Sequence, residues 1–323
     1  MKIAALDIGT NTALLLIAEI SPEHGTLKSL YNAQEIVRLG QGVDADRKIQ
    51  PEAKERLYNA LMKFQKLIKL YDVKYVVAVG TSALRDAKNS AALIREMDAK
   101  TGIEIKVITG DEEAEMTFLG AITGIAELPK RFLVMDIGGG STEFILGRAS
   151  SQLGARSAPV NFDVEDQVSV DMGSVRMTER FFKSLPPSKD DVEAARQAFI
   201  KQLSPKVGKF IAGREMMIAV AGTATTVAQL ALGLKQFSAN DIQGYNVKYD
   251  EAHSLYQTIL TKTPSEIEEM GVSPGRADVL PAGLLIFHQA MRLFSLTAVK
   301  VSIQGLRYGV VLKELERLRL MLR

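Results

Sequence analysis

The stretch FLVMDIGGGSTEFIL, Phe132–Leu146, sets the expectation for the whole chain. Four apolar residues lead into Asp136, a glycine triplet follows at Gly138–Gly140, and Ser141–Glu143 leads into a second apolar run. This order predicts a strand, a tight turn and a second strand. Glycines let backbone amides approach a ligand closely, which suits phosphate oxygens. Because carboxylates repel phosphate, Asp136 and Glu143 beside such a turn imply Mg²⁺ or a similar hard cation; the alternative is an ordinary glycine-rich hairpin with solvated acids.

The same pattern occurs near the N-terminus, where residues 3–17 read IAALDIGTNTALLLI. Asp7 takes the place of Asp136, 129 positions earlier. That alignment pairs three further positions of the two stretches: Gly9 with Gly138, Thr12 with Ser141, and Leu14 with Glu143. A strand–turn–strand unit repeated at this distance predicts two related lobes, each contributing one phosphate-binding turn to a shared cleft.

Composition excludes several classes of protein. A chain of 323 residues predicts two domains, and 46% apolar with 24% charged residues is typical of a soluble globular protein. The net charge of +2 gives no overall field that favours nucleic acid or a membrane. The absence of cysteine excludes disulfides, thiolate zinc sites and cysteine nucleophiles, and three widely spaced histidines argue against a histidine-rich metal site. With neither a signal-peptide pattern nor an apolar run long enough to span a bilayer, we expect a cytoplasmic protein that binds neither nucleic acid nor membrane.

Periodicity and turn residues predict the other elements. The expected strands are two hairpins at 2–20 and 131–148 and single strands at 27–39, 73–79, 104–109, 216–220 and 298–303. The expected helices begin at Pro51, Ala91, Gly110, Ser174 (as its cap), about residue 189, and residues 249 and 273, with a further helix at the C-terminus. Residues 149–170 are expected to be irregular with short strands.

Three further segments are candidates for anion binding. The strand that ends at Gly80–Ser82 leads to Arg85, whose planar guanidinium suits phosphate oxygens; the alternative is a helix cap with an exposed arginine. Residues 221–226 follow a strand in the same way, and they form either a phosphate or nucleotide contact or simply a tight strand-to-helix joint. Arg276 near the start of a later helix is the third candidate, with an ion pair to Asp278 as the alternative.

Three acids occupy the first turn of the helix that follows Gly110: Asp111, Glu112 and Glu113. Acids at this position complement the helix dipole, which accounts for the composition. The segment also lies just after a strand and just before the second glycine-rich turn. An acid there could orient or deprotonate a water molecule beside a bound phosphate.

Eight motifs, in order along the whole chain, resemble the exopolyphosphatase / guanosine pentaphosphate phosphatase family. They are Asp7–Asn11, Gly80–Arg85, Gly110–Ala114, Asp136–Glu143, Met172–Arg176, Ala221–Thr223, Arg276–Gly283 and Gly305–Gly309. The glycine-triplet motif alone is shared with sugar kinases and actin-like ATPases, whereas the full set is much more specific. The resemblance implies an α/β fold of two ribonuclease-H-like lobes of the actin, sugar-kinase and heat-shock-chaperone ATPase superfamily, with the active site in the interlobe cleft. We expect a short two-domain form with lobes at residues 1–128 and 129–323.

The resemblance also implies roles at matching positions. Glu113 falls on the catalytic residue thought to activate the attacking water, and Glu143 falls on an acid tied to catalysis and to the metal. The expected ligands of Mg²⁺ (or Mn²⁺) are Asp7, Asp136 and Glu143. The candidate phosphate-binding residues are Gly9, Thr10, Asn11, Thr12, Arg85, Gly138, Gly139, Gly140, Ser141, Gly222, Thr223 and Arg276. The implied activity is release of terminal orthophosphate from inorganic polyphosphate or guanosine pentaphosphate, and the expected assembly is a homodimer.

The chain departs from the family pattern at a few positions. Leu14 replaces a residue that is usually basic, and two acids are lost where Ile303 and Tyr308 stand. These changes leave substrate choice and chain-length preference open. Two other functions are compatible with the fold, namely a small-molecule kinase and a non-catalytic actin-like regulator that binds a phosphorylated ligand. Phosphate release in the absence of an acceptor distinguishes the hydrolase from both.

Overall fold

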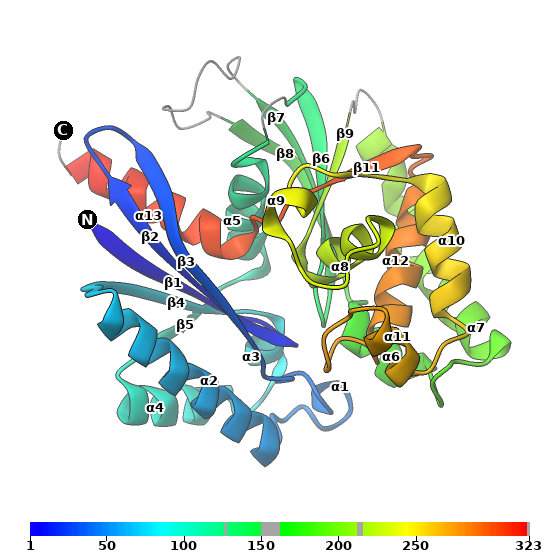
Figure 1. Cartoon of the computed structure of the whole chain (residues 1–323), viewed down its shortest axis with the longest axis horizontal. Helices are drawn as coiled ribbons and strands as arrows, with labels where there is room; N and C mark the ends of the chain where they lie inside the picture. The colour runs from blue at the N-terminus through cyan, green and yellow to red at the C-terminus, as the bar shows by residue number, and fades with distance from the viewer. Residues whose placement is uncertain (126–127, 150–161, 212–215, 322–323) are drawn as a thin grey trace. The chain divides into compact units, whose positions relative to one another are not determined.

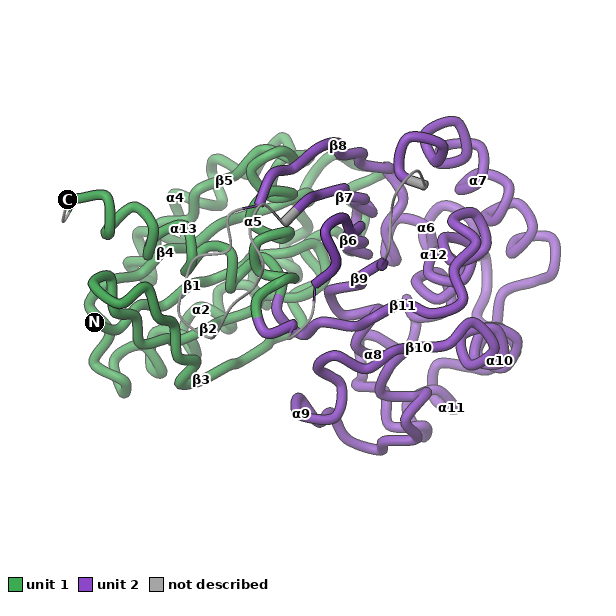
Figure 2. Tube along the Cα trace, turned by 90° about the horizontal axis from the view of Figure 1, so that it is seen from above, with its two compact units in different colours: residues 1–123, 151–161, 305–323 green, residues 124–150, 162–304 purple. Residues whose placement is uncertain are grey.

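Figure 1 shows the computed structural model, which describes residues 1–125, 128–149, 162–211 and 216–321. The described chain divides into two compact units (Figure 2). The first comprises Met1–Thr123 and the C-terminal segment that begins at Gly305, and the second comprises the described residues between Gly124 and Gln304. Each unit is built on its own mixed β-sheet.

The sheet of the first unit contains five described strands in the order β3-β2-β1-β4-β5. They are β1 (Lys2–Ile8), β2 (Thr12–Ser21), β3 (Thr26–Ile36), β4 (Tyr75–Gly80) and β5 (Ile105–Val107). The first three are antiparallel neighbours, and β4 and β5 run parallel to β1. The helices of this unit are α1 (Val43–Asp46), α2 (Pro51–Leu70), α3 (Ser82–Asp86), α4 (Ser90–Thr101), α5 (Gly110–Ile122) and α13 (Leu306–Met321).

Both faces of β1 are buried, and side chains that alternate along the strand belong to different core clusters. Leu6 and Ile8 of β1 belong to the core cluster that includes residues of α2 and α4. Ile3 and Ala5 of the same strand belong to a second cluster, which includes residues of α13. The continuous apolar run of β1 therefore reflects a strand covered on both sides.

The sheet of the second unit contains six described strands in the order β10-β11-β9-β6-β7-β8. They are β6 (Arg131–Ile137), β7 (Thr142–Ala149), β8 (Phe162–Val170), β9 (Met216–Val220), β10 (Asn246–Lys248) and β11 (Ala298–Val301). The strands β6, β7 and β8 are antiparallel neighbours, and β9 and β11 run in the direction of β6. The helices are α6 (Ser174–Phe181), α7 (Lys189–Ile211), α8 (Ala221–Ala231), α9 (Ala239–Ile242), α10 (Tyr249–Ile259), α11 (Pro264–Glu269) and α12 (Leu280–Leu293).

The predicted internal repeat is confirmed at the level of single residues. Asp7 pairs with Leu14 across β1 and β2, and Asp136 pairs with Glu143 across β6 and β7. Each aspartate also has a valine of a parallel strand as its other neighbour, Val79 or Val220. The two units thus repeat the strand order of ribonuclease-H-like lobes, so the predicted fold class is correct.

The compact units differ from the predicted lobes in the placement of one helix. The prediction assigned everything after residue 128 to the second lobe, whereas α13 packs within the first unit. A Cβ added to Gly309 of α13 would lie 1.8 Å from the carbonyl oxygen of Met116 in α5, so the two backbones touch. Val310 and Val311 of α13 share a buried cluster with Ile3 of β1. This packing, rather than position along the chain, decides the membership of α13.

Other element boundaries needed correction. The helix expected from residue 273 begins at Leu280, because residues 274–279 form turns before the Pro281 ring starts the helix. The cap of α6 is Gly173 and not Ser174, whose hydroxyl donates instead to the carbonyl of Gly138. Of the stretch expected to be irregular, residues 162–170 form strand β8, and residues 150–161 lie outside the described ranges. None of the described helices combines the length and hydrophobicity needed to cross a membrane.

A histidine pair lies between α10 and α12 in the second unit. His253 Nδ1 and His288 Nε2 are 3.1 Å apart, and the ring of Tyr256 stacks on His288 with centroids 4.4 Å apart. His288 is buried. Burial lowers its pKa to about 4, and the charges of His253 and Arg292 act in the same direction. His288 is therefore stable in its neutral form near pH 7.

Candidate active site

The glycine triplet of the second unit is held from behind by the start of α6. The amide of Gly173 donates to the carbonyl of Gly140 (3.1 Å), and that of Ser174 donates to Gly138 (2.9 Å). The next two amides of α6, at positions 175 and 176, both donate to the carbonyl of Gly139, at 2.9 and 3.0 Å. The first amides of α6, which would otherwise lack acceptors, are thereby satisfied by the turn.

This arrangement leaves the amide side of the turn available to a ligand. Gly138 closes the turn by donating to the carbonyl of Ser141 at 3.0 Å. In the described part of the chain, the amides of Gly139, Gly140 and Ser141 donate to no protein acceptor. Adjacent backbone amides of this kind form a concave site for an anion. The geometry fits the phosphate-binding role expected of these residues.

The turn of the first unit is built in the same way. Gly9 donates to the carbonyl of Thr12 at 3.0 Å, which repeats the closing bond of the second turn. The carbonyl of Asn11 accepts from the amides of residues 37 and 38 at 3.0 and 2.9 Å. Gly40 donates to the carbonyl of Thr10 at 2.8 Å, and Thr10 is buried. In both units a neighbouring segment therefore occupies the carbonyls of the turn.

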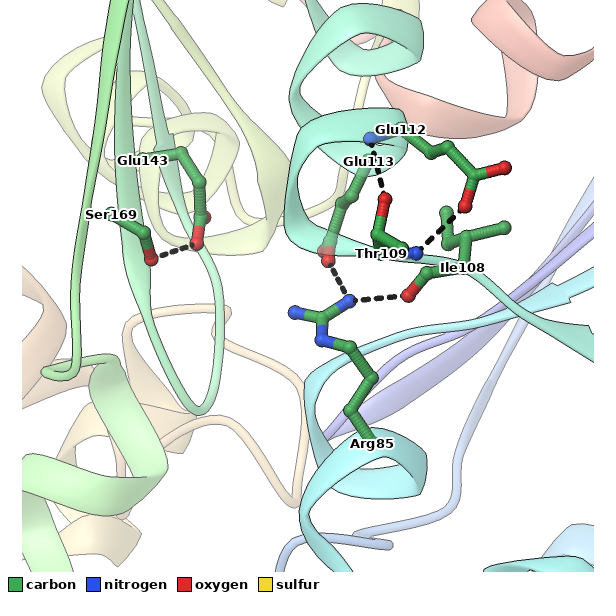
Figure 3. A network of polar contacts seen from close by, with 7 residues as sticks. All are labelled: Arg85, Ile108, Thr109, Glu112, Glu113, Glu143 and Ser169. Carbon is green, nitrogen blue, oxygen red and sulfur yellow. Dashed lines mark hydrogen bonds and ion pairs between the residues drawn. The ribbon is translucent and has the colours of Figure 1, made fainter.

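The three acids at the start of α5 have different roles. Thr109 caps the helix: its hydroxyl accepts from the amide of Glu112 at 3.1 Å, and the Glu112 carboxylate accepts from the amide of Thr109 at 2.8 Å. This reciprocal pair is a capping box, so Glu112 stabilises the helix start. Glu113 turns instead to Arg85, with Nη1 and Oε2 2.6 Å apart (Figure 3). The capping box thus fixes the helix register that presents Glu113.

Burial perturbs the carboxyl groups near this turn. The pKa of Asp7 is raised to about 7, first by burial and second by the charge of Glu113, against the opposing charge of Arg307. Burial also raises the pKa of Glu113, although the Arg85 guanidinium acts to lower it. Two interacting carboxyl groups that hold protons more tightly than usual suit a site that accepts a proton or binds a cation.

In the second unit, Asp136 and Glu143 lie directly opposite each other on adjacent antiparallel strands. Side chains of such a pair lie on the same face of the sheet. Glu143 is only 6% exposed, and its Oε1 accepts from the hydroxyl of Ser169 at 2.9 Å (Figure 3). Ser169 is the β8 neighbour of Glu143, so three adjacent strands supply this acidic cluster.

The remaining candidates of the second unit also lie together. Arg276 Nη1 donates to the carbonyl of Gly222 at 3.2 Å, and a Cβ at Gly222 would lie 2.6 Å from that nitrogen. A Cβ at Gly283 would lie 2.7 Å from the hydroxyl oxygen of Thr223 and 3.4 Å from Ser174 Cβ. Ser174 of α6 in turn donates to the glycine turn. Thr223 and Arg276 are therefore linked to that turn by a series of contacts through α12 and α6.

The residues present fit a hard divalent cation. Mg²⁺ keeps several waters and usually binds through one or two carboxylates together with substrate phosphates. In the second unit, Asp136 and Glu143 provide two carboxylates on one sheet face. In the first unit, the raised pKa of Asp7 marks a carboxyl group that a cation would stabilise in its ionised form. Within the described ranges, no group of three or more histidine, cysteine, aspartate or glutamate residues is arranged to hold a metal by itself.

Two residues near these clusters were not predicted. Ser169 had no sequence signal, because its contact with Glu143 depends on the register of β8. Arg307 lies within the motif Gly305–Gly309 that carried the family resemblance, and its charge acts on Asp7. Its Nε donates to Asn32 Oδ1 at 3.1 Å. Only the packing of α13 on the first sheet brings it there.

Comparisons with known proteins agree with this geometry. Exopolyphosphatase 2 of Mycobacterium tuberculosis is 33% identical over 300 residues, which cover 90% of this chain and 90% of that protein. The bifunctional 3-dehydroquinate synthase/phosphatase of Fusobacterium nucleatum is 30% identical over 97% of this chain, but the chain spans only 46% of that protein's length. The crystal structure of an exopolyphosphatase-like protein superposes with a TM-score of 0.88 at 31% identity, covering 98% of both chains.

The match to a protein family is equally extensive. The model of the Ppx/GppA phosphatase family matches residues 16–318, which include every candidate site residue except Asp7 and those of the first turn. The matched range contains the second glycine turn and the paired carboxylates Asp136 and Glu143 described above. The chain therefore belongs to the Ppx/GppA phosphatase family.

Proposed function

We propose that this protein hydrolyses a terminal phosphoanhydride, releasing orthophosphate from inorganic polyphosphate or guanosine pentaphosphate. The observation that carries the proposal is the pair Glu113–Arg85, a largely buried carboxylate that is held by an arginine and whose charge acts on Asp7, two residues before the first turn. The names of the relatives support the polyphosphate substrate, since the mycobacterial protein is an exopolyphosphatase. Guanosine pentaphosphate rests on the sequence resemblance alone.

In this proposal the two turns bind the phosphates. The amides of Gly139, Gly140 and Ser141 supply donors that no protein group uses within the described residues. Thr10 and Asn11 belong to the first turn, and Arg85 adds a positive charge on the same unit. We propose that the turns contribute positioning and charge neutralisation, which provide most of the acceleration in phosphoryl transfer.

Glu113 is the proposed general base. It aligns a water molecule for in-line attack on the terminal phosphorus and accepts its proton as the new oxygen–phosphorus bond forms. The bond from phosphorus to the bridging oxygen breaks, and the shortened chain leaves with the bonding electrons. A raised pKa makes Glu113 a stronger base than an exposed glutamate, which favours this step.

Asp7, Asp136 and Glu143 would hold Mg²⁺ or Mn²⁺, which when bound neutralises phosphate charge. Ser169 orients the Glu143 carboxylate through its 2.9 Å hydrogen bond. Such supporting hydrogen bonds fix the direction of a metal-binding carboxylate. The homodimer and the cytoplasmic location stay predictions, and light scattering of the purified protein would test the former.

The deciding experiment measures phosphate release with Mg²⁺ from long-chain polyphosphate, guanosine pentaphosphate and ATP in parallel, without an acceptor. Glu113→Gln should lower turnover by about 10²- to 10⁴-fold, the usual contribution of a general base. Glu112→Gln is the matched control, because glutamine preserves the capping box and this neighbour does not contact Arg85. A folded Glu113→Gln variant with near-native turnover would refute the role of Glu113.

The same assay separates the alternative functions. A kinase of this fold would release little phosphate without an acceptor, and a non-catalytic regulator would bind ligand without turnover. No release from any of the three substrates, with ligand binding retained, would overturn the proposed hydrolase.

A further inference from the structure

Among the described residues, Arg85 contacts the rest of the protein through one nitrogen of its guanidinium group, Nη1. Nη1 donates to the carbonyl of Ile108 at 3.0 Å and to Glu113 Oε2 at 2.6 Å. The first contact fixes the arginine to the segment between β5 and α5, and the second fixes it to α5 itself. The side chains of Arg85 and Glu113 are 26% and 13% exposed, so the ion pair is largely shielded from solvent.

The other two nitrogens of the guanidinium group, Nε and Nη2, differ from Nη1 in their contacts. Within the described ranges, neither Nε nor Nη2 donates to a protein acceptor. Figure 3 shows Nη2 pointing away from both the Glu113 carboxyl group and the Ile108 carbonyl. These two nitrogens form the parallel pair of donors with which arginine binds a carboxylate or phosphate in bidentate fashion.

The two oxygens of the Glu113 carboxyl group also differ in their contacts. Oε2 accepts from Arg85, whereas Oε1 accepts from no described residue. An ion pair through one oxygen holds the carboxylate next to Arg85 and leaves the other oxygen for a water molecule. The arginine and the base are thus joined by a direct contact.

We propose that Arg85 bridges substrate and base: its Nη1 holds Glu113 by Oε2, and its Nε and Nη2 bind a phosphate of the substrate, so that one guanidinium sets the position of the base relative to the phosphorus atom. This inference rests on the proposed hydrolase function. Water is activated through Glu113 Oε1, which takes up the proton. Arg85 contributes a positioning effect through Glu113 and a binding effect through the phosphate, and the two effects are separable.

Arg85→Lys tests the bridge, because an ammonium group is a single point donor that cannot make both contacts. The variant is made in the wild-type chain and in the Glu113→Gln chain, and turnover, KM and the pH profile are measured with polyphosphate. Arg85→Gln is the second variant if the lysine form does not fold. Arg95→Lys on the exposed surface of α4 is the control for arginine replacement.

In the wild-type background, Arg85→Lys should lower kcat by about 10²-fold, the effect of misplacing a reactive group by about 1 Å. In the Glu113→Gln background it should lower kcat by less than about threefold, since residues that act as a unit are not additive. Affinity for polyphosphate should fall by roughly tenfold or more in both backgrounds, the expected loss for a charged hydrogen bond. Loss of Arg85 should also move the acid limb of the wild-type pH profile upward, because the arginine lowers the pKa of Glu113.

Equal kcat losses in the two backgrounds would overturn the bridge and leave Arg85 as a phosphate ligand only. Unchanged affinity would overturn the phosphate contact. Either result leaves the proposed function standing, as long as the wild-type protein releases phosphate and Glu113→Gln releases it about 10²- to 10⁴-fold more slowly. A wild-type protein that releases none refutes the proposed function itself.

Discussion

Gly173→Ala is the most direct test of how the glycine turn of the second unit is built. Gly173 has φ −111° and ψ 176°, an extended conformation that alanine adopts without strain. Space is the obstacle, because a Cβ there would lie 2.4 Å from Gly139 C, 2.5 Å from Gly139 O and 2.6 Å from Gly138 O. All three atoms are backbone, so no side chain can rotate away. The start of α6 has to withdraw from the turn by about 1 Å to restore ordinary van der Waals contact.

The expected cost follows from the contacts that this shift removes. Four backbone hydrogen bonds of 2.9 to 3.1 Å join residues 173–176 to the glycine turn. Lengthening them by about 1 Å takes them beyond hydrogen-bonding range, at about 1 kcal/mol each, while solvent compensates part of the loss. Overpacking a dense site typically costs about 1 to 3 kcal/mol. We expect a loss of about 3 kcal/mol in the free energy of unfolding.

The assay combines urea unfolding with phosphate release from polyphosphate. Displacement of the turn should lower kcat/KM by about 10²-fold in the protein that remains folded. Gly208→Ala is the matched control: a Cβ at this position in α7 meets nothing within 4 Å. Replacing a helical glycine should raise stability by about 0.5 to 1 kcal/mol. If Gly173→Ala changed stability by less than about 0.5 kcal/mol and kept its turnover, the bracing of the turn by α6 would be refuted.

Three further changes test other parts of the structure. Gly309→Ala places a Cβ 1.8 Å from the carbonyl oxygen of Met116, so α13 has to separate from α5; we expect a loss of about 3 kcal/mol in urea unfolding, and an unchanged midpoint would contradict the backbone contact. Ser169→Ala removes the hydroxyl that donates to Glu143, and it should weaken activation by Mg²⁺ by about tenfold or more in a metal titration; an unaltered titration curve would show that this hydrogen bond does not support the metal site. The pKa of His288 is about 4 in the folded state and about 6.5 when unfolded. The neutral histidine therefore makes its full contribution to stability above pH 6.5, and about 3 kcal/mol of that contribution is lost as the pH falls to 4. His288→Gln should abolish that slope, which is measured as the difference between the two proteins in urea unfolding at each pH; a constant difference would refute it.

Local patterns were sufficient for the repeated hairpins. A run of apolar residues before Asp7 and Asp136, followed by glycine-rich turns, predicted two strand–turn–strand units. The structure confirms the repeat, because in both hairpins the aspartate pairs with the residue seven positions later on the next strand. Strand alternation and turn chemistry act over a few residues, so the sequence expresses them directly. The capping box of Thr109 and Glu112 belongs to the same class, because its threonine and glutamate are three residues apart.

The tertiary structure decided which distant groups meet. Arg85 was a candidate phosphate ligand and Glu113 a candidate base, yet nothing in the spacing of 28 residues indicated that they form an ion pair. The glycine triplet predicted amides that could approach a ligand. Only the structure shows that the start of α6 donates to the carbonyls of the turn and leaves its amides without a protein acceptor among the described residues.

The C-terminal helix gives the clearest case. The sequence predicted a helix there, whereas the structure places it in the first unit and brings Arg307 near Asp7. Helix formation is set by residues three and four positions apart. The site of packing depends on glycine-lined backbone contacts, such as that of Gly309 with Met116, between segments almost 200 residues apart. A hydrophobic helix face has to be buried, but it does not specify which segment covers it, because the hydrophobic effect is not directional.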